Sequence, residues 1–440
     1  GTLEVTTSIR EEDGKTQVTI ELTEHEVKKH IDSFFKDLAK NRIPGFRPGK
    51  APRKVLERNF GGHEAIYAEI TSDMVNEVLP LALDSKDVIF IDDPKLVDEK
   101  VESVEDGKPY TFEVYGEVAP KLTLTSVEPV EIEMPPATAT DEEIEAQLES
   151  LRDYYYEFEE VDRAAEEGDY VMMSIDAKTD GVAVDALNSP SRLVELGSDA
   201  LPKELTDQVL GMKKDETKEF DFEVAEDDEQ LADFKGKTIH AEVTVSKVQT
   251  KELPTLDEEF AKRIGFDTLE QTREEIANQI NTQRERQLPE LKERRCVEAL
   301  AKRIEGEIPE SYINYSRDEV LREFFNNLQS AGITFDQFLA QRGISADEFR
   351  ADLDDEAKEN AEQSLALDAL FEAHGMELTD ADIDEQFQVV DDPAAARKSW
   401  EESGRMSLLR EGIRRSKAAQ WLIDNAIVTE EAAKEGASDN

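Results

Sequence analysis

The chain has 440 residues, and at about 150 residues per domain this length indicates roughly three domains. It carries 103 acidic and 52 basic residues, a net charge of -51, which argues against a protein devoted to wrapping nucleic acid. The single cysteine, Cys296, excludes an intrachain disulfide, so we expect a buried bystander thiol in a reducing compartment. No apolar run approaches the roughly 18 residues of a membrane helix, and no targeting segment is evident. A soluble cytoplasmic protein is therefore expected.

Residues 1–117 have the pattern of an α+β domain. Apolar and polar residues alternate over 3–10 and 16–22 around Asp13-Gly14, which predicts a β-hairpin. Thr23 and Glu26 form a capping-box pattern, and apolar residues then recur at helical spacing as far as Lys40. Further helices are expected over 52–60 and 63–85, and strands over 88–97 and 110–118.

The rest of the chain divides by composition. Four prolines within 119–140 predict an extended linker, and Thr140 with Glu143 begins a helix to about Phe158, so 118–160 is assigned to linker and helix. Short strands and one helix over 202–210 predict a small β domain over 161–248. Residues 249–435 are almost all helical by period, with capping patterns such as Thr255/Glu258 and Thr379/Asp382. Extended helical arms are expected there, and a disordered tail over 436–440.

Catalytic and metal-binding patterns are absent from the sequence. The five histidines have no paired spacing, and there is no EF-hand loop or nucleophile elbow. Gly45 to Lys50 superficially resembles a phosphate-binding loop, but its spacing is one residue short and Ala51 replaces the Ser or Thr that would hold magnesium. We therefore expect no metal and no cofactor.

Residues 40–58 carry a net positive charge within a negatively charged chain, because they contain seven basic residues and one acid, Glu57. A solvated basic loop is the ordinary interpretation of such a segment. Phe46, between Gly45 and Arg47, favours the alternative, because an aromatic residue beside Arg is suited to anchor a negatively charged partner.

The stretch Gly45-Phe-Arg-Pro-Gly-Lys-Ala-Pro52 resembles the ribosome-docking signature of the trigger factor family, the ribosome-associated chaperones of bacteria. Gly375 to Asp382 is similar to the arm sequences of the same family. The resemblance covers essentially the whole chain. It implies a multidomain α+β protein with an α+β ribosome-docking domain, a small β domain like the FK506-binding prolyl isomerases, and an all-α domain with extended arms.

The resemblance also implies partners. Phe46 and Arg47 would contact a ribosomal protein and rRNA of the large subunit near the tunnel exit. Gly45 and Gly49 would shape the loop, and Lys50 would meet phosphates. Nascent or unfolded polypeptides would be the clients, and family members can form homodimers off the ribosome.

Three functions compete at this point. The first is an ATP-independent chaperone that holds nascent chains, and the second is a prolyl isomerase whose working part is residues 161–248. The third, a free RNA-binding module, is the weakest, because the basic patch is one loop without aromatic platforms for bases. For the first, we expect most apolar residues of the arms to be core and the remainder to bind clients. The candidates are Phe324, Phe325, Leu328, Phe335, Phe338 and Met376.

The small β domain has an unusual composition for an isomerase. Isomerases of this type hold the X-Pro bond in an aromatic-walled pocket, and there is no Phe, Tyr or Trp between Met172 and Lys218. By alignment with the family, Ile175, Val184 and Arg192 stand where aromatic pocket walls are expected, with Leu201 and Leu205 around the short helix. Glu229 and Ala241 occupy two more such places. We therefore expect prolyl isomerase activity to be weak or absent.

Overall fold

The computed structural model describes residues 3–12, 14–98 and 101–431, so the tail predicted over 436–440 lies outside the described residues. The chain is a mixed helix-and-sheet protein of several parts, which confirms the predicted fold class. By compactness it falls into two units, and each is described by itself. The first contains Gly1–Met134 and Pro289–Glu431, and the second contains Pro135–Leu288. The domain ranges proposed from the sequence stay a prediction.

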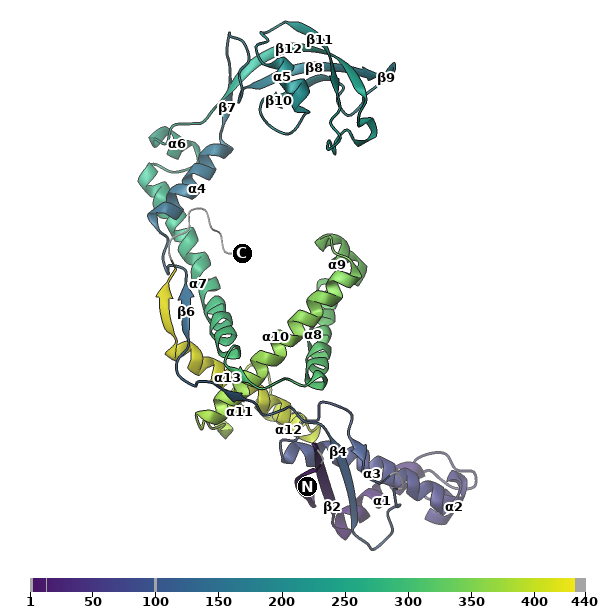
Figure 1. Ribbon diagram of the computed structural model, residues 1–440. Coiled ribbons are helices and arrows are strands. Elements are labelled where there is room, and N and C mark those ends of the chain that lie inside the picture. Colours follow the sequence, from purple (N-terminus) through teal and green to yellow (C-terminus); the bar gives the residue numbers. More distant parts are fainter. Residues whose placement is uncertain (1–2, 13, 99–100, 432–440) are drawn as a thin grey trace. The chain divides into compact units, whose positions relative to one another are not determined.

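The first unit begins with a four-stranded antiparallel sheet. Its strands are β1 (Val5–Glu12), β2 (Lys15–Leu22), β3 (Lys95–Leu96) and β4 (Tyr110–Gly116), in the order β1-β2-β4-β3, and the predicted hairpin is confirmed. Three helices accompany the sheet: α1 (Glu24–Ala39), α2 (Arg53–Phe60) and α3 (His63–Ser85) (Figure 1). Ile20 and Phe112 of the sheet share one core with Ile31 and Ile70 of the helices.

One local prediction in this region is wrong and another is confirmed only in part. The strand expected over 88–97 is reduced to β3 and a single bridge between Phe90 and Val118, because Pro94 cannot donate to a ladder. The capping box of α1 is only half formed. The Thr23 hydroxyl accepts from the Glu26 N–H at 3.2 Å, but the buried Glu26 carboxylate accepts from the Glu4 N–H at 3.4 Å.

The proline-containing segment after β4 is extended, as predicted, and it is also paired. Its strand β5 (Thr123–Leu124) pairs with β13 (Ile304–Glu305), and β6 (Glu131–Met134) pairs in parallel with β14 (Ile427–Glu430). The Arg303 guanidinium donates to the Glu128 carbonyl at 2.5 Å. The segment is therefore fixed to the helical part of its unit rather than free.

The helical part of the first unit contains the C-terminal end of α7 (Leu269–Ala301) and six further helices. These are α8 (Glu310–Ala331), α9 (Phe335–Arg342), α10 (Ala346–Ala373), α11 (Asp380–Gln386), α12 (Pro393–Glu402) and α13 (Met406–Asn425). α8 and α10 lie side by side, and α9 joins their ends (Figure 1). The fully buried alanines Ala357 and Ala361 let the two helices approach, and the Ser316 hydroxyl donates across to the Ala357 carbonyl at 2.9 Å.

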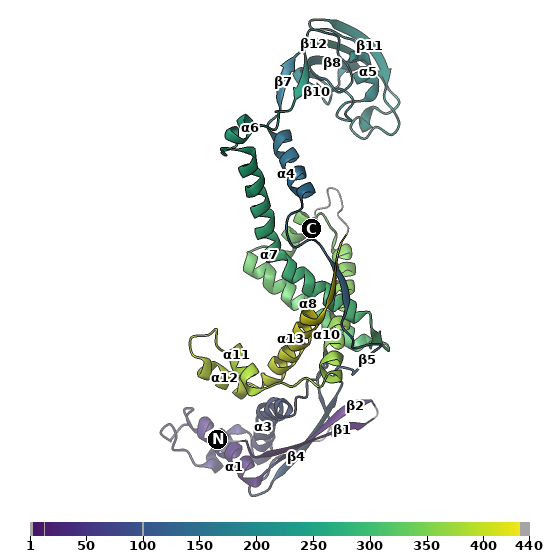
Figure 2. The same cartoon turned by 90° about the vertical axis from the view of Figure 1, so that its left-hand side faces the viewer.

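α3 joins the sheet region to α13 (Figure 2). Arg405, the residue preceding α13, does not cap the helix with its side chain. The Asp84 carboxylate of α3 accepts instead from the Ser407 N–H and hydroxyl. A carboxylate at a helix N-terminus satisfies free N–H groups and interacts favourably with the helix dipole. Arg410 donates to Asp87 at 2.6 Å beside this contact.

Cys296 is fully buried, as predicted, and burial raises the pKa of its thiol.

The second unit contains three helical pieces and a small β domain. α4 (Asp141–Tyr154) and α6 (Glu258–Arg263) pack with the N-terminal part of α7 around Leu148, Phe260 and Ile276. The capping box of Thr140 and Glu143 is confirmed, but the helix ends at Tyr154 rather than Phe158. The predicted cap at Thr255 is also wrong, because Asp257 caps α6 by accepting from the Phe260 N–H at 2.9 Å.

The short strands and the single helix predicted over 161–248 are present in the β domain. The sheet has the order β10-β8-β12-β11, with β7 also paired to β12 and β9 to β8. Its elements are β7 (Glu157–Glu160), β8 (Tyr170–Thr179), β9 (Val182–Ala183), β10 (Ser189–Glu195), α5 (Lys203–Val209), β11 (Thr217–Glu223), a short 3-10 helix (Ala232–Phe234) and β12 (Thr238–Glu252).

Candidate functional site

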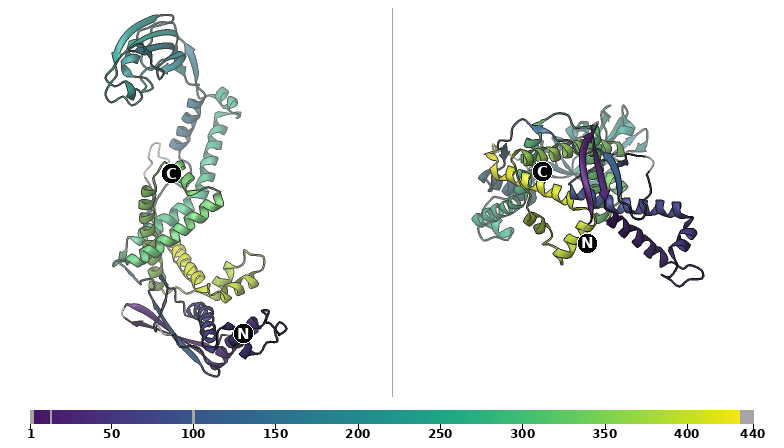
Figure 3. Two further views of the ribbon diagram at one scale, coloured as in Figure 1. Left: turned by 90° about the vertical axis from the view of Figure 1, so that its right-hand side faces the viewer. Right: turned by 90° about the horizontal axis from the view of Figure 1, so that it is seen from below.

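The loop between α1 and α2 has a defined backbone. The Gly49 N–H donates to the Ala39 carbonyl at 2.6 Å, which closes the loop onto the end of α1, and the Lys50 N–H donates to the Arg47 carbonyl at 3.0 Å. Gly45 and Gly49 have φ values of +86° and +84°, a left-handed conformation that other residues adopt at a cost of roughly 1–2 kcal/mol. The two glycines therefore permit the turns that present the residues between them. Figure 3 shows the loop at the edge of the N-terminal region.

The side chains of this loop face solvent. Phe46 is 40% exposed and Arg47, Gly49 and Lys50 are exposed, whereas Ile43 is half-buried against the core. Phe46 has no ring partner within the described residues. The loop thus holds an aromatic side chain in water, which costs free energy unless a partner covers it.

The charges around Phe46 are mostly uncompensated. In the part of the chain that the structure describes, the side chains of Arg42, Arg47 and Lys50 have no ion-pair or hydrogen-bond partner. Arg53 differs, because it pairs with Asp32 and its guanidinium lies 4.7 Å from the ring centroid of Phe35. Arg53 therefore stabilises the fold, while the other cations are free to meet an external anion.

The predicted client-binding phenylalanines gather where α8, α9 and α10 meet. Phe324 lies at the centre: its ring centroid is 4.8 Å from those of Phe338 and Phe349, and Phe335 is 5.0 Å from Phe349. Phe325, 46% exposed, lies 5.5 Å from Phe324 and forms the outer side of the group. We call Phe324, Phe325, Phe335, Phe338 and Phe349 the phenylalanine cluster.

Two of the predicted client-binding residues lie elsewhere. Leu328 is only 7% exposed, so its side chain packs inside and cannot contact a client. Met376 follows the far end of α10 and lines a groove of about 450 Å³. Other residues of this groove include Leu122, Phe371 and Arg414. From Phe349 to Phe371 the helix rises by roughly 33 Å, so Met376 and the phenylalanine cluster are separate surfaces.

Phe349 was missed by the sequence analysis although a signal for it exists. Ser345 caps α10 and Glu348 donates its N–H to that hydroxyl at 3.1 Å, as the sequence pattern predicts. A hydrophobic residue just before the cap commonly packs on the fourth helical residue, and these positions are Ile344 and Phe349. The same pattern around the cap Thr334 selects Ile333 and Phe338.

Most of the proposed isomerase pocket positions are core, whereas Arg192 is half-buried and Glu229 is exposed. Ile175, Val184, Leu201 and Leu205 are between 0 and 4% exposed and belong to one hydrophobic cluster of the β domain. Phe222 is buried in this cluster, and Phe220 and Phe234 pack against it. These aromatic side chains are therefore explained by packing.

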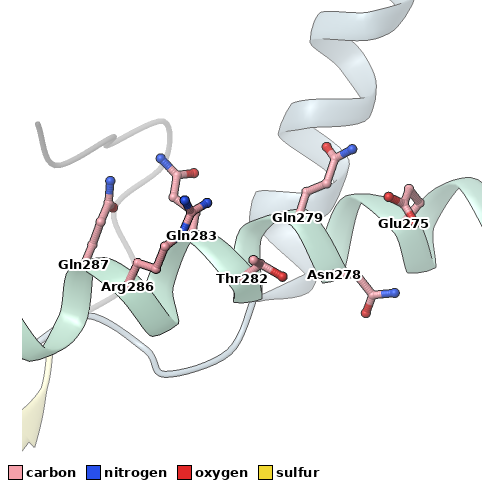
Figure 4. Close-up of a pocket in the computed structure, with 7 residues that line it drawn as sticks. All are labelled: Glu275, Asn278, Gln279, Thr282, Gln283, Arg286 and Gln287. Atoms are coloured by element: carbon pink, nitrogen blue, oxygen red, sulfur yellow. The ribbon is translucent and has the colours of Figure 1, made fainter.

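The N-terminal part of α7 has a long polar face that carries no catalytic constellation (Figure 4). All its residues recur at intervals of three or four, which places them on one side of the helix. They are Glu275, Asn278, Gln279, Thr282, Gln283, Arg286 and Gln287. Among the described residues, no group of three or more His, Cys, Asp or Glu could hold a metal ion, and no helix is both long and apolar enough to cross a membrane.

Comparisons with known proteins identify the family. Residues 4–151 match the model described as bacterial trigger factor protein, and residues 268–424 match the model of the trigger factor C-terminus, together more than half of the chain. The chain belongs to the trigger factor family. The resemblance predicted from Gly45 to Pro52 is thereby confirmed, and so is the chaperone function, whereas prolyl isomerisation as the main activity is not supported.

Individual relatives are similar over nearly the full length. The trigger factor of Mycolicibacterium smegmatis is 28% identical over 423 residues, which cover 94% of this chain and 88% of that protein. The trigger factor of Natranaerobius thermophilus is 29% identical and covers 94% of each chain. A solved structure from work on promiscuous substrate recognition by the trigger factor chaperone is 21% identical, with a TM-score of 0.40 and coverage of 95% of this chain and 98% of that chain.

Proposed function

We propose that this chaperone docks at the tunnel exit of the large ribosomal subunit and holds nascent polypeptides there without ATP. The observation that carries the docking is the segment Arg42–Lys50, in which exposed Phe46 stands among three cations, Arg42, Arg47 and Lys50, whose side chains have no partner in the described residues. The cytoplasm, where ribosomes translate, is its proposed location.

The physical chemistry of the loop supports an RNA-containing partner. Arg47 and Lys50 would neutralise phosphates, and phosphate contacts supply affinity without reading sequence. Phe46 would fill an apolar depression on a ribosomal protein, since a central aromatic side chain is the usual anchor of a small interface. The remaining surface carries most of the charge of -51 and is repelled by RNA, so docking would be confined to this loop.

The phenylalanine cluster is the proposed client surface. Phe325 offers the most exposed ring, while Phe324 and Phe335 hold it in position through their ring contacts. Unfolded chains expose apolar side chains, and an exposed aromatic group can cover them. The high charge of the surrounding surface keeps this group soluble when no client is bound.

Co-sedimentation with purified ribosomes at graded salt tests the docking. The double variant Phe46→Ala with Arg47→Ala is expected to lose ribosome binding, with a change in stability of only about 0.5 kcal/mol, as is usual for surface substitutions. A matched control is Ile9→Ala with Arg10→Ala, since Ile9 is 44% exposed and lies beside an exposed arginine in the same region. This control is expected to bind as the unaltered chain does.

Ribosome binding by the Phe46/Arg47 variant at the affinity of the unaltered chain would remove the docking proposal. Equal losses in both double variants would remove it as well, because the effect would then be one of general surface charge.

A further inference from the structure

The sheet of the β domain has one covered face and one open face. In β8, Val171, Met173 and Ile175 are between 0 and 3% exposed and point into the hydrophobic cluster. Tyr170 and Met172 alternate with them and therefore lie on the opposite face, where they are half-buried. An antiparallel sheet with one solvated face ordinarily carries polar residues there, so these apolar side chains need an explanation.

The strand register joins these residues into one stripe. Leu193 of β10 is directly opposite Met172, so the two share a face. The Phe158 ring of β7 lies 5.0 Å from Tyr170, and Tyr156 lies 5.2 Å from Phe158. We call Tyr156, Phe158, Tyr170, Met172 and Leu193 the outer-face stripe.

The outer-face stripe is accessible within its unit. Tyr156 is 44% exposed, Phe158 37% and Leu193 39%. It crosses the four strands β7, β12, β8 and β10, which lie next to one another in Figure 1. Three strand spacings amount to about 14 Å, a distance that about four extended residues span.

Glutamates stand at both ends of the row that contains Tyr170. Glu160 of β7 is opposite Gln249, Gln249 is opposite Tyr170, and Tyr170 is opposite Glu195 of β10. Both carboxylates are exposed. Burial, together with Glu195, raises the pKa of the Tyr170 hydroxyl, which keeps that hydroxyl available as a donor to Glu195.

The middle of this face, on the central strand β12, carries two lysines rather than glutamates. The Lys251 ammonium lies 4.6 Å from the centroid of the Tyr156 ring, so it is occupied by the stripe itself. Lys247 is opposite Met172. Positive charge therefore sits in the middle of the face and negative charge at the two sheet edges. Between Glu157 and Glu252 acidic residues outnumber basic ones by more than two to one.

We propose that the outer-face stripe is a second client site, which binds a short extended segment of an unfolded polypeptide with a basic residue at each end of three apolar residues. Side chains alternate along an extended segment, so the two cations, four residues apart, face the sheet together with the central apolar side chain. That side chain would cover Tyr170, and the two cations would reach Glu160 and Glu195. This inference rests on the chaperone function proposed above and gives it a further site with its own specificity. A second copy of this chain is a poorer occupant, because it would bring the same excess of negative charge.

The test uses the full chain and a labelled peptide containing Lys-Phe-Val-Leu-Lys between Gly/Ser flanks. A second peptide carries Glu in place of both lysines. The variant Glu160→Lys with Glu195→Lys reverses both ends of the row. Glu159→Lys is the matched control, because Glu159 is exposed on the same strand but faces the other side of the sheet.

We expect the double reversal to weaken binding of the basic peptide about tenfold at low ionic strength and to strengthen binding of the acidic peptide, with both effects screened at high salt. Glu159→Lys should change binding less than twofold. Equal effects of Glu159→Lys and the double reversal, or no effect of the double reversal, would overturn the proposal. It would also be overturned if the double reversal altered self-association, measured by sedimentation, and not peptide affinity. Failure of the chaperone function would appear separately, as an inability of the unaltered chain to suppress client aggregation.

Discussion

Replacing Phe325 with alanine tests whether the phenylalanine cluster holds clients. A phenylalanine side chain presents about 200 Å² of surface, so an exposed fraction of 46% leaves about 90 Å² for a client to cover. At about 25 cal/mol per Å², full coverage contributes about 2 kcal/mol, or roughly 30-fold in affinity. Phe325→Ala should weaken binding by up to this factor while retaining the ring contacts among Phe324, Phe338 and Phe349.

The assay combines suppression of aggregation of an unfolded client with the affinity for a labelled unfolded peptide. Leu408→Ala is the control, because Leu408 is 50% exposed on α13 and belongs to no aromatic group. Thermal unfolding of both variants separates loss of binding from loss of fold. If Phe325→Ala and Leu408→Ala hold clients equally well, the cluster is core only and the reasoning is refuted.

Three further predictions concern other parts of the chain. Prolyl isomerase activity should be weak or absent in a proline-containing tetrapeptide assay, because Ile175 and Leu205 fill the pocket positions with core side chains, and turnover comparable to an active FK506-binding isomerase would contradict this. Asp382 accepts from Lys417 and Thr379, which lower its pKa to about 2, so its stabilising effect is present above pH 3.8 and is lost as the pH falls through about 2. The difference in thermal stability between the unaltered chain and Asp382→Asn should disappear over that interval, and a difference that persists at lower pH would exclude the ion pair as its cause. Gly404→Ala should lower the melting temperature, since φ of Gly404 is +70° and the new Cβ would lie 2.9 Å from the Pro80 carbonyl oxygen. An unchanged melting temperature would show that α3 and the α12–α13 turn can move apart at this contact without loss of stability.

Local patterns in the sequence predicted the elements well where short-range chemistry decides them. The hairpin of β1 and β2, the capped start of α4 and the alternation of β8 all follow from neighbouring residues. The strand expected over 88–97 is reduced to Lys95–Leu96 because Pro94 lacks the N–H that a ladder needs. The cap predicted at Thr255 failed for a different reason: Asp257 competes for the same free N–H groups at the start of α6.

Contacts between distant segments could not be predicted from such patterns. Asp84 caps α13 across more than 300 residues of sequence, and β6 pairs with β14 over a similar separation. Glu26 matches the capping box by spacing, yet its carboxylate accepts from a distant backbone N–H, that of Glu4. Among the candidate site residues, exposure at Phe46 follows from its place between glycines, whereas the burial of Leu328 depends on tertiary packing.

In the proposed docking, the loop Gly45–Lys50 meets the ribosome while the rest of the surface stays away. A photo-crosslinking amino acid introduced in place of Phe46, or separately in place of Ile9 as the control position, tests this claim on ribosomes that carry a nascent chain. We predict crosslinks from position 46 to a protein and to rRNA of the large subunit near the tunnel exit, and none from position 9. Crosslinks from position 9 with none from position 46 would rule out docking through this loop.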